Sequence, residues 1–310
     1  MRIAADYDGR PADLMVAVHA WRSSGAIEKF KAKFPGRPVI LQLSGTDIYH
    51  YLESDPVPTR RAMELADRLV ALNDLAWRRV SRSLRSRLFV IHQSAMASPY
   101  PRRPDPRDVV VSVIGHLRDV KDPLRAAEAA RLLPANSRIR IEQVGRAYTP
   151  QWTGRARAEM KANPRYLWRG DVPASAVRRL LARSHAMVIS SLSEGGANVI
   201  SEAAVAGVPV LASRVDGNVG LLGADYPGYF PAGDTRALAR LLQRLEHDPR
   251  FAARLAQALA RRAPLFRPAR EIAAWRRLLA GLSVPVLRQT SDAVRRRNRS
   301  TSRSAAQRPA

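Results

Sequence analysis

A glycine-rich turn carries the residues with the clearest chemical potential. Residues 193–196 read SEGG, and a second acidic residue, Glu202, follows Glu194 by eight positions. Adjacent glycines let a backbone approach a ligand closely. The helix predicted to start at about Asn198 would add free N–H groups and the positive end of its dipole. The pattern therefore predicts an anion site flanked by two carboxylates.

The two carboxylates are expected to bind hydroxyl groups rather than the anion. A carboxylate repels a phosphate, whereas its acceptor-only oxygens suit the diols of a sugar or a ribose. A pair of exposed glutamates on a surface helix is the alternative interpretation. The glycines and the apolar run at 207–210 stand in register with a strand–turn–helix–strand unit, which favours the ligand site.

A second segment combines a glycine turn with cations. Residues 112–123 read SVIGHLRDVKDP. This is a strand, a turn at Gly115, and then Arg118 and Lys121 before a helix that the Asp-Pro pair is expected to start. A solvated basic helix start is the alternative.

The elements that must position these residues alternate along the chain. Short apolar runs predict strands at Leu14–His19, Val39–Leu43, Arg68–Leu72, Leu88–His92, Val109–Ile114, Ile139–Val144, His185–Ser190 and Val208–Ala212. Helical patterns lie between them, at Gly25–Phe34, Thr59–Ala66, Pro123–Leu133, Ala174–Ser184, Val199–Ala206 and Thr235–Leu245. Continuous apolar strands separated by helices are typical of parallel sheet covered on both faces, so we expect an α/β fold.

Composition narrows the class of protein. Of the 310 residues, 46% are apolar, which excludes global disorder. There is no cysteine, which excludes disulfides, thiolate nucleophiles and thiolate metal sites. No apolar run reaches the ~18 residues of a membrane span, and the N-terminus lacks the apolar segment of a signal peptide. A cytoplasmic protein is expected.

The charge balance is strongly basic, with a formal net charge of +25. Nearly all of the excess is arginine, and an Arg-rich nucleic-acid-binding protein is one interpretation. The arginines are scattered over predicted helix faces, however, and aromatic residues make up only 6%, too few for an obvious base-stacking platform. Nucleic acid is therefore not the expected partner.

Proline and charge divide the chain. Residues 98–108 hold four prolines, which cannot continue a helix or a central strand, and they predict a linker. It would join an N-terminal domain at 1–97 to a C-terminal domain at 109–265. Residues 283–310 hold seven arginines against one aspartate and have no apolar period, which predicts a disordered basic tail.

The Glu-x7-Glu pattern at Glu194 and Glu202 resembles the signature of retaining GT-B glycosyltransferases of the family-4 type. The resemblance implies two Rossmann-like doubly wound domains facing a cleft, with Glu194 on the donor sugar and Glu202 on the ribose. It also implies that Arg118 and Lys121 hold the donor diphosphate. Opposite unit charges ~4 Å apart attract by about 4 kcal/mol at an effective dielectric of about 20, enough to stabilise this leaving group without a metal.

The same resemblance supplies further expectations. The loops after the later strands, with Gly145 and Val172, border the nucleotide base in the family. The full donor-binding set is Gly115, Gly145, Val172, Gly195, Gly196, Ala197, Asn198 and Glu202. The pattern FRPAREIAAWRRLL at 266–279 matches the closing helix that returns to the N-terminal domain, expected over 266–282.

Several motifs are closer still to the glycosyltransferase-like selenosugar synthases of selenoneine biosynthesis. They are AVHAWRSS at 17–24, LSGTDIY at 43–49, GHLRDVKDP at 115–123 and SEGGANVISEA at 193–203. The resemblance covers roughly residues 5–282 and implies that the selenium of selenophosphate displaces UDP from UDP-N-acetylglucosamine or UDP-glucose. The residues alone support only nucleotide-sugar transfer. A conventional family-4 transferase moving a hexose to a glycan, lipid or small molecule stays the main alternative.

The acceptor is expected to enter from the N-terminal domain. Because selenophosphate is a small anion, the expected contacts are Arg22, Ser23, Thr46 and Asp47, beside His19. The expected catalytic residues are His19, Arg118, Lys121 and Glu194. A satisfied histidine at a strand end is the alternative for His19. No metal or other cofactor is expected, because the Asp-x-Asp motif at 6–8 lacks a nucleotide-binding context.

Two departures from the family pattern affect these expectations. The chain opens at what looks like the second strand, Arg2–Ala5, which predicts an incomplete N-terminal domain and Met1 as an internal or misassigned start. Such a domain would expose sheet that helices should cover. Ser44 stands where many family-4 enzymes place a histidine, so His19 becomes the expected histidine near the reaction centre.

Overall fold

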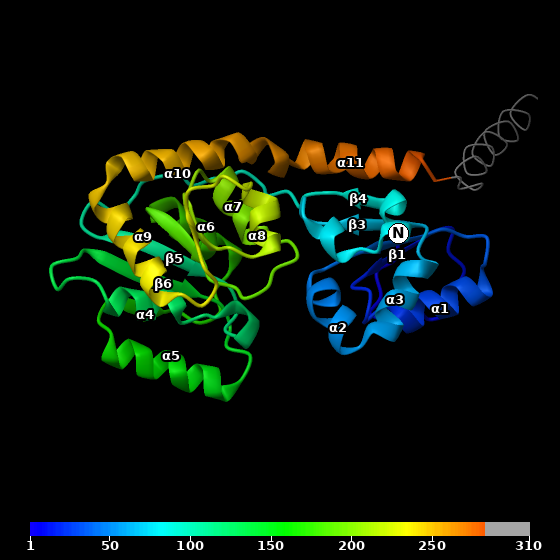
Figure 1. The fold of residues 1–310 in the computed structure, drawn as a ribbon, viewed down its shortest axis with the longest axis horizontal. Helices are drawn as coiled ribbons and strands as arrows, with labels where there is room; N and C mark the ends of the chain where they lie inside the picture. Colours follow the sequence, from blue (N-terminus) through cyan, green and yellow to red (C-terminus); the bar gives the residue numbers. More distant parts are fainter. Residues whose placement is uncertain (283–310) are drawn as a thin grey trace, which may run out of the picture.

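The computed structural model describes residues 1–282, and the basic tail predicted at 283–310 lies outside the described residues. Two parallel sheets, each with its own helices, make up the fold (Figure 1). The strands predicted from the apolar runs all form, with ends shifted by no more than two residues. The α/β prediction is therefore confirmed.

The N-terminal sheet has four parallel strands in the order β1-β2-β3-β4. They are β1 (Met15–Val18), β2 (Val39–Gln42), β3 (Arg68–Ala71) and β4 (Leu88–Val90). Two helices, α1 (Ser24–Lys33) and α3 (Pro56–Leu65), pack on one face around the buried Ile27, Phe30 and Met63. A π-helical turn at Asp47–Tyr51 and the short α2 (Leu52–Ser54) follow β2.

The C-terminal sheet has six parallel strands in the order β10-β9-β8-β5-β6-β7. They are β5 (Val109–Ile114), β6 (Ile139–Val144), β7 (Tyr166–Trp168), β8 (Ala186–Ile189), β9 (Val210–Ser213) and β10 (Tyr229–Phe230). The chain winds outward from β5 in one direction, returns to the other side of β5 at β8, and then continues away from it. This is the doubly wound Rossmann order, and β5 and β8 border its switch point.

Seven helices accompany the C-terminal sheet. They are α4 (Arg125–Arg131), α5 (Pro150–Ala162), α6 (Ala174–Arg183), α7 (Asn198–Val205), α8 (Asp216–Leu222), α9 (Thr235–His247) and α10 (Pro249–Arg262). Aspartates cap the last two of these helices: Asp234 accepts from the backbone of Ala237 at 2.8 Å, and Asp248 from that of Phe251 at 2.9 Å.

The last helix crosses from one sheet to the other. A turn at Ala263–Phe266 separates α10 from α11 (Pro268–Ala280). Leu278 of α11 is buried against Ile40, Val70 and Ile91 on the second face of the N-terminal sheet. Figure 1 shows α10 and α11 running along the same side of the two sheets.

Two sequence-based expectations about local structure are wrong. The segment Arg2–Ala5 forms no strand, and Ile3 is 87% exposed, because nothing pairs with it and β1 is the edge of its sheet. The helix expected from Pro123 starts instead at Arg125. Asp122 adopts a left-handed backbone conformation (φ 44°), and its carboxylate pairs with Arg125 rather than capping the helix.

Two further features concern the edges of these units. Val16 and Val18 on the edge strand β1 are each about half exposed. Residues 98–108 contain no helix or strand, and their backbone bonds to the end of α6, with the Arg103 amide donating to the Ala182 carbonyl at 2.8 Å. Among the residues that the structure describes, no helix has both the length and the apolar character needed to cross a membrane.

Candidate active site

The C-terminal ends of β5 and β8 meet at the switch point of the larger sheet. The two strands are neighbours, with Val113 opposite Val188. β5 leads into Gly115, and β8 leads into Ser190 and the SEGG turn. Open α/β sheets bind ligands at such a crevice. A cavity of about 30 Å³ lies here, lined by Gly115, His116, Lys121, Gln143, Ser190, Ser191, Glu194 and apolar neighbours.

The predicted cation and acid of this site are in direct contact. The Lys121 ammonium pairs with Oε1 of Glu194, whose side chain is only 7% exposed. The Ser191 hydroxyl donates to the same oxygen at 2.5 Å. The hydroxyl of Ser190 donates to the carbonyl of Lys121 at 3.2 Å, which fixes the turn that carries the lysine. The turns after β5 and β8 are therefore joined by side chains of opposite charge.

Arg118 lies one turn earlier and is not among the residues that line the cavity. Its guanidinium stands over the ring of Tyr148 at 5.7 Å. Its Nε is buried and has no hydrogen-bond partner, and within residues 1–282 no carboxylate forms an ion pair with it. Arg118 therefore keeps charge and donors available for an anion, as a diphosphate contact requires.

Helix α7 begins at Asn198, where the sequence predicts its start. Its first turn contains no acidic side chain, and the residue before it, Ala197, offers no side-chain cap. The first amides of α7 are thus open to a ligand, beside Gly195 and Gly196.

Glu202 lies one turn into α7 and does not line the cavity shared by Lys121 and Glu194. It accepts a hydrogen bond from Asn198 Nδ2 at 3.2 Å. Burial raises the pKa of Glu202, and the charge of Arg178 opposes this rise. The two predicted acids therefore lie in different environments. Glu194, just before α7, is paired with Lys121, whereas Glu202, within α7, is partly desolvated.

The remaining donor-side predictions fall on two loops. Gly145 has φ 140°, and a Cβ there would collide with the carbonyl of Gly115, so the loops after β5 and β6 touch through their backbones. The Gly145 amide donates to the Gly170 carbonyl at 2.8 Å. Val172, in the loop after β7, packs against a small apolar cluster that includes Val144 of β6 and Val110 of β5.

Gln143, two residues before Gly145 in the loop region expected to border the base, is a further residue of this site. It is 1% exposed, and its Oε1 accepts from the Tyr166 hydroxyl at 2.7 Å. Its Nε2 has no hydrogen-bond partner and lines the cavity. The signal in the sequence is a glutamine at the penultimate position of β6, next to the turn at Gly145, where a buried amide needs a polar partner.

On the N-terminal side, His19 ends β1 with φ 73°. Such backbone strain in a non-glycine residue is concentrated at functional sites. Its Nε2 lies 2.9 Å from the Thr46 hydroxyl, and its Nδ1 accepts from the backbone of Arg22 at 3.3 Å. Burial lowers the pKa of His19; the Asp47 carboxylate opposes this shift, and Arg22 adds to it. His19 is therefore a neutral imidazole, and Arg22 is exposed beside it.

Two of the predicted acceptor contacts, Asp47 and Ser23, bond to the protein backbone instead. Asp47 is fully buried, and its carboxylate accepts backbone hydrogen bonds from Ala20, Ser44, Gly45 and Ile48. It therefore positions the loops after β1 and β2 rather than facing a substrate. The Ser23 hydroxyl donates to the Val18 carbonyl at 2.8 Å, which turns it toward the backbone. Of the expected acceptor set, Thr46 and Arg22 lie next to His19.

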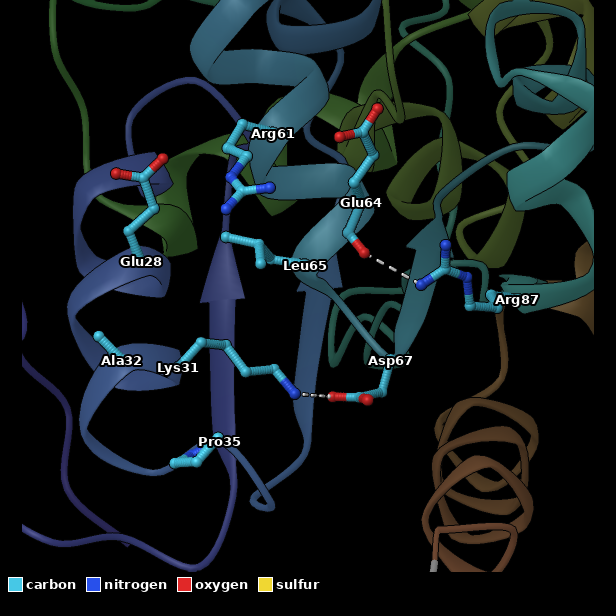
Figure 2. A pocket seen from close by; sticks show the side chains of 9 residues that line it. All are labelled: Glu28, Lys31, Ala32, Pro35, Arg61, Glu64, Leu65, Asp67 and Arg87. Carbon is cyan, nitrogen blue, oxygen red and sulfur yellow. Dashed lines mark hydrogen bonds and ion pairs between the residues drawn. The ribbon is translucent and has the colours of Figure 1, made fainter.

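A larger hollow lies elsewhere, between α1 and α3, with a volume of about 690 Å³. Figure 2 shows Lys31 directed at Asp67 and Arg87 directed at the carbonyl of Glu64. Lys31 and Asp67 pair at 2.8 Å, and this hollow shares no lining residue with the switch-point site. The Asp-x-Asp motif is also separate, since Asp8 pairs with Arg2 at 2.7 Å.

A family model described as glycosyl transferases group 1 matches residues 101–262, more than half of the chain. Among curated proteins, "Glycosyltransferase 1 domain-containing protein 1" of Xenopus tropicalis is 29% identical over 140 residues. That match covers 45% of this chain and 40% of the relative, so the chain matches less than half of the relative's length.

Solved structures agree on the fold. Anabaena HepE in complex with UDP and glucose superimposes with a TM-score of 0.72, at 19% identity, over 87% of this chain and 78% of that one. The α,α-trehalose-phosphate synthase (UDP-forming) of Burkholderia xenovorans gives a TM-score of 0.71, at 14% identity, over 87% of this chain and 75% of that one. With two Rossmann-like sheets in a GT-B arrangement and a matching family model over its C-terminal half, the chain belongs to the glycosyl transferases group 1 family.

Proposed function

We propose that this glycosyltransferase takes its sugar from a UDP-sugar, UDP-N-acetylglucosamine or UDP-glucose, and transfers it to the selenium of selenophosphate without a metal. The observation that carries the donor side is the Lys121–Glu194 contact at the switch point. The open amides of α7 and Arg118, which forms no ion pair within residues 1–282, would add positive charge for the donor. HepE, which shares the fold, binds UDP and glucose.

The proposed chemistry is displacement at the anomeric carbon. The C1–Se bond forms while the C1–O bond to the diphosphate breaks, and the diphosphate keeps the electron pair. Lys121 and Arg118 would stabilise the charge that develops on this leaving group, which is the largest contribution such a site can make. Glu194 would hold sugar hydroxyls. Selenophosphate is already anionic, so a neutral His19 is no obstacle to the reaction.

The acceptor side rests on the motifs at 17–24 and 43–49 and on the surroundings of His19. Arg22 is an exposed cation three residues after the strained His19, and the Thr46 hydroxyl lies 2.9 Å from the Nε2 of His19. A cation and a hydroxyl suit a small oxyanion.

Two measurements test the proposal. Calorimetric titration with UDP should show binding, and Glu202→Ala should weaken it about tenfold through loss of the ribose contact. Incubation with a UDP-sugar and selenophosphate should give a selenium-containing sugar by mass spectrometry. Absence of UDP binding would overturn the donor assignment, and turnover with alcohol acceptors alone would overturn the selenophosphate assignment.

One observation favours a conventional saccharide acceptor as the second candidate. Trp21, two residues from His19, stacks on Tyr51 with ring centres 4.2 Å apart, and its indole N–H donates to Asp55 at 2.7 Å. Trp21 also lines a groove of about 640 Å³ together with Asp55, Glu28 and Arg61. Aromatic faces bordered by carboxylates suit a sugar ring. Trp21→Ala should abolish transfer to a saccharide and spare transfer to selenophosphate.

A further inference from the structure

Asn73 reaches from the N-terminal sheet into the donor-binding turn of the other sheet. It follows β3, is fully buried, and donates from Nδ2 to the carbonyl of Gly195 at 2.6 Å. Its Oδ1 accepts from the amide of Leu75 at 2.8 Å, which fixes the orientation of its amide. The Oδ1 of Asn73 is thus bonded within its own loop, and its Nδ2 is bonded to the turn that carries Glu194.

The surrounding contact is made almost entirely by glycine backbones. A Cβ on Gly45 would lie 2.6 Å from the Gly195 nitrogen, and one on Gly196 would collide with the side chain of Leu72. On the opposite side of the turn, a Cβ on Gly217 would collide with the carbonyl of Glu194. The turn is therefore clamped between α8 of its own sheet and the loops after β2 and β3 of the other sheet. We call this contact the glycine seam.

We propose that Asn73 is a positioning residue that makes the geometry of the donor-binding turn depend on closure of the glycine seam. The inference rests on the proposed function at one point, namely that the turn binds a UDP-sugar donor. When the two sheets are together, Asn73 holds the Gly195 carbonyl and so fixes the backbone on which Glu194 stands. When they separate, the turn loses its only side-chain hydrogen bond from the other sheet, as far as residues 1–282 show.

The cavity at the switch point is small, at about 30 Å³, which is room for about one water. We therefore expect the donor to enter with the seam open and the reaction to follow its closure. Asn73 contributes only in the closed state, so its loss is expected to lower kcat more than donor affinity.

The test is Asn73→Asp. The aspartate has the same shape and still accepts from Leu75, but it cannot donate to Gly195 and faces that carbonyl with negative charge. Deuterium exchange of residues 191–198 should become at least about tenfold faster, because a buried carbonyl left without its donor favours opening. With a UDP-sugar, kcat should fall about tenfold or more, while the Kd for UDP changes less than about threefold.

Asn163→Asp is the control. Asn163 is 2% exposed, donates from Nδ2 to the Ala127 carbonyl and to the Glu159 carboxylate, each at 2.9 Å, and accepts at Oδ1 from the backbone two residues on, all within the C-terminal unit. It should lower stability and leave exchange at 191–198 and the ratio of kcat to UDP affinity unchanged. Asn73→Ala, which buries no charge, is the second variant if the aspartate prevents folding.

Three outcomes would overturn the inference. These are wild-type exchange and kcat in Asn73→Asp, the same changes in Asn163→Asp, and equal losses of UDP affinity and kcat. Failure of the proposed function is distinguishable, because it shows as wild-type protein that does not bind UDP, and the exchange measurement on the free protein still reports on Asn73.

Discussion

The ion pair between Lys121 and Glu194 exists before any donor arrives, and this shapes what each residue can do. A lysine held by a buried carboxylate and by a fixed turn is already oriented, so little side-chain entropy is lost when a diphosphate comes within reach. Glu194 in turn has its second oxygen free of the lysine for a hydroxyl. A buried ion pair adds little net stability, although removing either partner leaves the other charge buried and unpaired. We therefore interpret the pair as a preorganised element of the site.

Replacing Lys121 by methionine tests this arrangement at the residue scale. The apolar side chain keeps the length but removes the charge that faces the leaving diphosphate, so kcat/KM should fall by about 10²–10³. Lys161→Met, on the exposed end of α5, is the matched control and should retain wild-type rates. Loss of less than about threefold in Lys121→Met would show that another group stabilises the leaving group.

His19 gives a prediction for pH. Burial lowers its pKa below the ordinary 6.5, against the charge of Asp47 and together with that of Arg22. Between the lowered folded pKa and the unfolded value, the unfolded chain binds more protons, so stability must fall as pH falls below 6.5. The difference in unfolding free energy between wild type and His19→Gln should shrink there, by at most about 1.4 kcal/mol per pH unit. Urea unfolding at several pH values measures it, and a pH-independent difference would contradict the assignment.

Site residues differ in how far the sequence could reveal them. Lys121, Glu194 and the start of α7 follow from strand–turn–helix patterns, because the end of a buried parallel strand fixes where the next residues must lie. Asp47 looks like an exposed polar residue in a loop, and only the folded loops show that its carboxylate collects four backbone amides. Asn73 carries no local signal, because its partner lies 122 residues away in the chain.

At the scale of elements, eight strands and six helices were predicted from the sequence, whereas the strands β7 and β10 and the helices α5 and α8 were not. β7 and β10 have three and two residues, too few for an apolar period to appear. α8 contains two glycines in seven residues, which argues against helix from propensity alone. Tertiary contact overrides that propensity, because Gly217 and Gly220 are the positions at which α8 approaches the donor turn and the loop of Asn73.

The cap of α9 offers a prediction at this scale. Asp234 satisfies the amide of Ala237, so Asp234→Ala should lower the free energy of unfolding by about 1 kcal/mol. Asp234→Ser should stay close to wild type, because serine also caps. Equal stability of the alanine and serine variants in urea unfolding would show that the cap contributes nothing.

At the scale of the whole molecule, two ion pairs within residues 1–282 join the sheet units, with the arginine on opposite units. Arg78 from the N-terminal unit lies 3.2 Å from Asp216, and Arg262 from the C-terminal unit lies 2.7 Å from Asp74. Burial works against ionisation of Asp74, but hydrogen bonds from His92 and Arg262 outweigh it and hold the pKa of Asp74 below its ordinary value. Arg262 also donates to the carbonyls of Gly220 and Leu221, so it ties α8 to the loop after β3.

A double-mutant cycle on Asp74→Asn and Arg262→Gln measures the strength of that link. The Asp74 side chain is 43% exposed, so solvent screening limits the expected coupling to about 0.5–1 kcal/mol. The coupling should decrease when salt is raised from about 0.05 to 1 M. A coupling that is zero at low salt would show that this ion pair contributes nothing to holding the two units together.

The seam itself has one consequence for how such a molecule can change. Because Gly45 and Gly195 meet through main-chain atoms, any side chain added at either position must push the two backbones apart. Replacing either glycine by alanine and then by valine would thus increase the separation in steps and show how closely the two units must approach for turnover. The same chain, lacking cysteine, offers a clean background for placing reporters on either half.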